Sequence, residues 1–109
     1  MEDDVAATGY RMRYLDADGK EQKISARTLD RMAYVEGHAP CGRYEIKQAL
    51  GGELWDLHEV RTLEERGIWT IEWIEAGDEN HEGAWRILAL DEVGRNVLRK
   101  WREREAAQK

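Results

Sequence analysis

The sequence of residues 53–75 is ELWDLHEVRTLEERGIWTIEWIE, and this stretch decides the fold because its hydrophobic period changes at Gly67. Before that glycine, apolar side chains recur at every third position: Leu54, Leu57, Val60 and Leu63. That spacing is typical of one face of an α-helix. Glycine can adopt the left-handed backbone conformation that ends many helices. We therefore predict one helix over residues 53–66 that stops at Gly67.

After Gly67 the apolar residues alternate, which is typical of a strand. Trp69, Ile71 and Trp73 fall on one face of a strand over residues 68–75. Residues 77–83 are polar and hold two glycines, so they predict a turn. A second strand over residues 84–90 then pairs with the first, and Trp85 lies opposite either Trp69 or Trp73.

The remaining chain supplies four further elements. Residues 10–14 and 21–24 form an N-terminal hairpin around an Asp18-Gly19 turn. Ser25 caps a helix that stops at Gly37. A short helix covers residues 43–50, and a last helix covers residues 92–107 after Asp91. The apolar positions that we expect to face inward from the short helix are Tyr44, Ile46, Ala49 and Leu50.

The order of these elements is hairpin, three helices, hairpin and helix. It predicts an α+β fold in a single domain over residues 10–109, after an acidic tail over residues 1–9. Three helices followed by a two-stranded hairpin correspond to a helix-turn-helix with an appended wing. We therefore expect a winged helix-turn-helix with an added N-terminal β-hairpin and a C-terminal helix.

Three motifs strengthen this expectation: RYEIKQALG at residues 43–51, VRTLEERGI at 60–68 and LDEVGRNVL at 90–98. In this order and spacing they resemble the second helix, the end of the third helix and the segment after the wing in MarR-like and PadR-like regulators. The resemblance implies a small prokaryotic or phage transcriptional regulator whose third helix enters the major groove of double-stranded DNA. Arg43 and Lys47 would contact phosphates, and the residues expected on the groove side are Trp55, His58, Arg61 and Thr62.

Charge favours a second hypothesis. The chain has 23 acidic against 17 basic residues and a net charge of −6. The predicted third helix carries two bases, Arg61 and Arg66, against five acids: Glu53, Asp56, Glu59, Glu64 and Glu65. Such a face repels phosphates unless only His58, Arg61 and Thr62 point outward. The alternative is an acidic module that binds a basic protein partner, for example an anti-CRISPR-like phage inhibitor of a nucleic-acid-binding defence complex.

The five tryptophans suggest either a core under the last helix or a partner interface. One or two such rings normally suffice for a domain of this size, and tryptophan is enriched at binding hot spots. We predict a homodimer or a complex with another protein. The residues from which its interface would draw at least one ring are Trp69, Trp73, Trp85 and Trp101.

Other classes of function find little support. A catalytic site is not expected because no phosphate loop or nucleophile pair is recognisable, and no cofactor is expected. His38 and Cys41 have a ligand-like spacing, but no second pair completes a metal site. No apolar run is long enough to cross a membrane, and the acidic start does not resemble a signal peptide. The single cysteine fits a reducing cytoplasm.

Overall fold

The computed structural model describes residues 10–53, 55–75, 77 and 83–107. Predictions that concern the tail over residues 1–9, Leu54 or the turn residues 78–82 lie outside this part. The elements in chain order are β1 (Tyr10–Leu15), β2 (Glu21–Ser25), α2 (Ala26–His38), α3 (Arg43–Leu50), α4 (Leu57–Glu65), β3 (Trp69–Glu75), β4 (Ala84–Leu90) and α5 (Glu92–Ala107). The predicted α+β class is confirmed, and α3, β4 and α5 have the predicted bounds.

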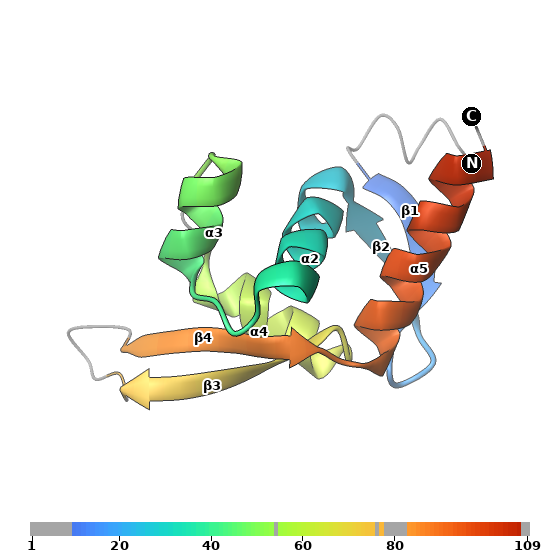
Figure 1. Cartoon of the computed structure of the whole chain (residues 1–109). Helices are drawn as coiled ribbons and strands as arrows, with labels where there is room; N and C mark the ends of the chain where they lie inside the picture. The colour runs from blue at the N-terminus through green and yellow to red at the C-terminus, as the bar shows by residue number, and fades with distance from the viewer. Residues whose placement is uncertain (1–9, 54, 76, 78–82, 108–109) are drawn as a thin grey trace.

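Helix α2 lies in the middle of the molecule, where it contacts β2, α3, α5 and β4. Figure 1 shows the β1–β2 hairpin beside α5 at one end, and the β3–β4 hairpin extending below α3 at the other. The inward face of α2 carries fully buried side chains, Leu29, Met32 and Val35. Ser25 caps this helix as predicted, because its side chain accepts the Thr28 N–H.

Two predicted helix ends are wrong. Helix α4 starts at Leu57 instead of residue 53, because Asp56 has an extended backbone and its side chain caps the helix. Helix α2 continues through Gly37 to His38, and the Ala39 N–H still donates to Val35 O. A glycine at the end of a helical pattern does not have to leave the helix, since only a left-handed conformation would end it there.

Helix α3 buries less than its sequence suggests. Of the four apolar positions predicted to face inward, only Ile46 is buried, while Tyr44, Ala49 and Leu50 are exposed. The physical reason is that α3 is a short helix that packs on α2 along one side. One apolar stripe is enough for that contact, so the other three positions meet solvent.

The β3–β4 ladder is antiparallel and places Trp73 opposite Trp85, one of the two predicted pairings. The register shifts between Thr70 and Ile71 and again between Trp73 and Glu75, so the ladder contains two bulges. The other edge of β4 also finds a partner. Ile87 exchanges both backbone hydrogen bonds with Cys41, in the loop between α2 and α3.

Residues 66–68 join four parts of the fold. The carbonyl of Arg66 accepts the Ala17 N–H from the β1–β2 turn, and the carbonyls of Gly67 and Ile68 accept N–H groups from the start of α5. Gly67 has a φ of 88°, the left-handed conformation predicted for it. The bond from Ala17 gives the cap carbonyl at the end of α4 a partner that the helix itself does not supply. The N-terminal hairpin therefore fixes the end of α4.

The Asp16 carboxylate holds the β1–β2 turn in this position. It accepts hydrogen bonds from the Gln22 side chain and from the N–H groups of Asp18 and Lys20. The Gln22 bond first, and then the backbone bonds, lower the pKa of Asp16 below its usual value of 3.8. Because the Asp16 pKa is lower in the folded state, the ionised carboxylate stabilises the fold at pH values above the usual aspartate pKa. This contribution disappears as the pH falls through the folded-state pKa.

We expect Asp16→Asn to destabilise the protein at neutral pH, because an amide offers one acceptor oxygen for three donors. Thermal unfolding of both proteins across the acidic range checks this. The difference in melting temperature between wild type and variant should be constant above the usual aspartate pKa and should shrink at lower pH. A difference that stays the same down to about pH 2 would show that the Asp16 charge has no part in it.

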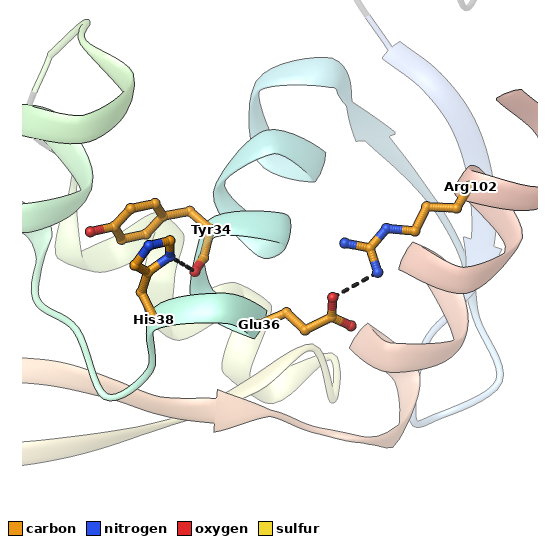
Figure 2. Close-up of polar contacts among 4 residues, drawn as sticks. All are labelled: Tyr34, Glu36, His38 and Arg102. Atoms are coloured by element: carbon orange, nitrogen blue, oxygen red, sulfur yellow. Dashed lines mark hydrogen bonds and ion pairs between the residues drawn. The ribbon is translucent and has the colours of Figure 1, made fainter.

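Two side-chain contacts lie near the end of α2, as Figure 2 shows. Glu36 reaches α5, where its Oε1 lies 2.6 Å from Arg102 Nη1. Tyr34 and His38 stack on the side that faces α3, with ring centroids 4.0 Å apart. Both side chains of the ion pair are about half exposed, so the pair orients α5 against α2 more than it stabilises the fold.

Candidate functional site

An open concave surface lies along α4. It is lined by residues at helical spacing together with the start of the helix: Asp56, Leu57, His58, Arg61, Thr62 and Glu65. Three of the four residues that we predicted to face a groove, His58, Arg61 and Thr62, are thus brought together. The Thr62 hydroxyl donates to His58 O at 2.9 Å, so its methyl group and its oxygen lone pairs remain for a ligand.

The acids of this region are not spread evenly around α4. The Asp56 carboxylate accepts the His58 N–H as the helix cap, and Glu64 Oε2 accepts the Ile71 N–H of β3 at 2.9 Å. The negative charge of Glu59 opposes the lowering of the Arg31 pKa that burial of the guanidinium causes. Glu65 is the acid that lines the hollow without such a role. The hollow itself is therefore lined by two acids, Asp56 and Glu65, and one arginine, Arg61.

The prediction for Trp55 is wrong. Its side chain is 3% exposed and lies before the helix, not on its outer face. The Trp55 ring packs edge-on against Trp69, with centroids 4.8 Å apart, and the Arg31 guanidinium lies 4.0 Å from its ring centroid. Buried between an aromatic ring and a cation, Trp55 cannot reach a bound molecule and belongs to the core.

A sequence signal for the true start of α4 was present. Asp56 and Glu59 have the spacing of a cap residue and the third helical residue, a common start of helices. Trp55 and Val60 occupy the two positions of a hydrophobic staple, the residue before the cap and the fourth residue of the helix. Both are buried in the core. The run of apolar residues from Leu54 obscured this signal, because it extended the helical pattern backwards.

Arg43 and Lys47 lie one turn apart on α3, and neither lines the hollow on α4. Lys47 is exposed. Arg43 is half-buried, with its guanidinium 5.4 Å from the Tyr44 ring centroid and 5.9 Å from that of Trp85. The two bases share a helix face, and the structure does not join them to His58 or Arg61 in one site.

The four tryptophans predicted for a partner interface separate into two groups. Trp69 and Trp85 are buried, and Trp69 Nε1 donates to Val60 O at 3.0 Å, so their assignment to an interface is wrong. Trp101 is half-buried against the core. Trp73 is 42% exposed near the end of β3, which makes it the most exposed of the four rings.

Other reactive groups in the described residues give no further site. Burial raises the pKa of the Cys41 thiol to about 11, so the group is a protonated core side chain at neutral pH. Among the residues that the structure describes, no three His, Cys, Asp or Glu side chains are grouped so that they could hold a metal ion. Within the same residues, no helix is long and apolar enough to cross a membrane.

No protein-family model, curated protein or solved structure matches this chain. The function is therefore inferred from the side chains themselves. The described residues define a small α+β protein with an open polar hollow on a short helix and an apolar hairpin at one end.

Proposed function

We propose that this protein is a small DNA-binding transcriptional regulator of the winged-helix type, with α4 as the helix that enters the major groove. The observation that carries the proposal is the open face of α4, where His58, Arg61 and Thr62 line one hollow. In this proposal α3 and α4 form the helix-turn-helix, and the β3–β4 hairpin is the wing.

The chemistry of these side chains suits base edges. An arginine can donate two hydrogen bonds to the O6 and N7 atoms of guanine, and a threonine methyl group can contact the methyl group of thymine. Histidine can donate to an acceptor on a base edge or a phosphate. Glu64 binds a β3 amide and does not line the hollow, so the acids that remain there are Asp56 and Glu65.

The proposed complex uses few phosphate contacts. Arg43 and Lys47 on α3 are the side chains that we assign to the DNA backbone, and Asp56 and Glu65 in the hollow oppose binding. Each neutralised phosphate changes the slope of log K against log salt by close to one unit. We therefore expect a shallow slope of about −2 to −4.

We predict that Arg61→Ala weakens binding to duplex DNA strongly and makes the salt slope about one unit shallower, because it removes a positive charge from the open face of α4. Fluorescence anisotropy with labelled random duplex DNA, at low and at physiological salt, measures the change. Arg99→Ala is the matched control, since Arg99 is an exposed arginine on α5 away from the hollow. The control should change the affinity less than twofold.

A substitution that adds positive charge to the hollow tests the same face in the opposite direction. Glu65→Lys should tighten binding and steepen the salt slope by about one unit, while Glu105→Lys on α5 gives the same net charge away from the hollow. Equal gains from both variants would show that overall charge acts and not the α4 face. If the wild type binds no duplex at about 10 µM protein in low salt, the DNA-binding proposal fails.

A further inference from the structure

The β3–β4 hairpin exposes three large apolar side chains. Trp73 is 42% exposed, Ile74 62% and Leu88 36%. Ile74 and Leu88 lie within the two register shifts of the ladder, where bulges interrupt the pairing. Clustered exposed apolar side chains on a single element commonly mark a surface for another molecule. The DNA contact proposed for α4 uses none of these three residues.

The same hairpin has an open edge. In the described residues, β3 and β4 form a two-stranded sheet, and the far edge of β4 pairs with Cys41. Strand β3 is therefore the edge strand. One of its backbone groups, the Ile71 N–H, is already engaged by Glu64 near the start of the strand. The part of β3 beyond Ile71 is where Trp73 and Ile74 are exposed, and an edge strand can pair with an added strand.

Charge decides which strand can be added. Residues 68–90 contain five acids and a single base, Arg86. That arginine is bound to Glu72, with Nη2 2.8 Å from Oε1. A second copy of this hairpin, or the phosphates of a nucleic acid, would bring like charge to this edge. A segment rich in lysine or arginine would bring the opposite charge and is favoured by complementarity.

We propose that the exposed end of β3 binds an extended, basic segment of another protein as an added strand. The backbone around Trp73 and Ile74 supplies the pairing, the side chains of these two residues contact apolar residues of that segment, and the negative charge of the hairpin selects lysine and arginine. This docking surface is separate from the α4 hollow.

The first experiment tests the pairing and the charge with defined probes. Isotope-labelled full-length protein is titrated with a short peptide of alternating valine and lysine, and its amide resonances are followed. We expect saturable shifts in residues 69–75 with a Kd below about 1 mM. A valine–glutamate peptide should not bind, for reasons of charge. A valine–lysine peptide interrupted by prolines should not bind either, because proline removes the N–H donors that a ladder needs.

Variants then locate the surface. Trp73→Ala should weaken valine–lysine binding by about tenfold, the usual effect of removing an aromatic contact at a hot spot. Leu15→Ala is the control, because Leu15 is 65% exposed on the other hairpin. It should leave the affinity unchanged. Glu75→Lys, which leaves Trp73 in place, should weaken the valine–lysine peptide and strengthen the valine–glutamate peptide. Circular dichroism confirms that each variant is folded.

Several results would overturn the proposal. One is binding of the proline-interrupted peptide as tight as that of the uninterrupted valine–lysine peptide. The others are amide shifts confined to residues outside the hairpin, and equal losses of peptide affinity in Trp73→Ala and Leu15→Ala. Shifts of the β3 amides by duplex DNA, with none by the peptide, would make the hairpin a nucleic-acid contact instead. Arg61→Ala separates the two proposals, because it should weaken DNA binding and leave peptide binding intact.

Discussion

Gly94→Ala is expected to cost the protein about 3 kcal/mol or more of its free energy of unfolding, and to lower the melting temperature by about 10–20 °C. A Cβ atom at Gly94 would lie 2.1 Å from the carbonyl oxygen of Ile68 and 2.9 Å from its carbonyl carbon. These are backbone atoms at the start of β3, so no rotamer change relieves the contact. Helix α5 would have to move away from residues 66–68, where the fold is joined.

Gly37→Ala is the matched control for this prediction. Gly37 is also a helical glycine, but a Cβ atom there would meet nothing within 4 Å. Alanine in a helix is favoured over glycine by about 0.5–1 kcal/mol. Thermal unfolding should therefore show opposite signs for the same chemical change. An unchanged melting temperature for Gly94→Ala would mean that α5 does not lie against Ile68.

The second large effect is expected at Trp69. Trp69→Ala should destabilise the protein by about 3–5 kcal/mol, the range for removing a large aromatic ring from a core. Its side chain is fully buried, packs edge-on against Trp55 and donates a hydrogen bond to Val60 O. The substitution leaves a cavity under α4, and it also removes the donor that the Val60 carbonyl has from outside its helix. Denaturant titration measures the loss.

Trp73→Ala provides the comparison on the same strand. Trp73 is half exposed, so the same truncation should cost about 1 kcal/mol or less. The two variants separate a core tryptophan from a surface tryptophan with no change in chemistry. Comparable losses at the two positions would show that Trp73 is also part of the core, and they would remove the surface on which strand addition depends.

The local patterns in the sequence predicted most of the secondary structure. The change of period at Gly67 separates α4 from β3, and the positive φ at that glycine is the one that such a change requires. Strand β4 and helices α3 and α5 have the predicted bounds, because each is bordered by glycine or by a residue that can cap a helix. Such signals act over a few residues, so the sequence expresses them directly.

The bounds that failed depend on contacts farther away. The apolar periodicity from Leu54 extended α4 too far, although the described residues before Asp56 lie outside the helix. Trp55 fits a helix pattern in the sequence, and yet it is Trp69 and Arg31 that bury it. Apolar spacing alone cannot distinguish a residue of a helix face from one that packs in front of the helix.

The candidate site shows the same division. The sequence by itself determined which residue types α4 carries, its three possible outward side chains, and the negative charge of the β3–β4 hairpin. Only the tertiary structure decided that Glu64 binds a β3 amide, that the charge of Glu59 acts on Arg31, and that Trp69 and Trp85 lie inside. The physical reason is that composition and periodicity are properties of neighbouring residues. The direction of a charge or a ring depends on partners that are distant in the chain and adjacent only after folding.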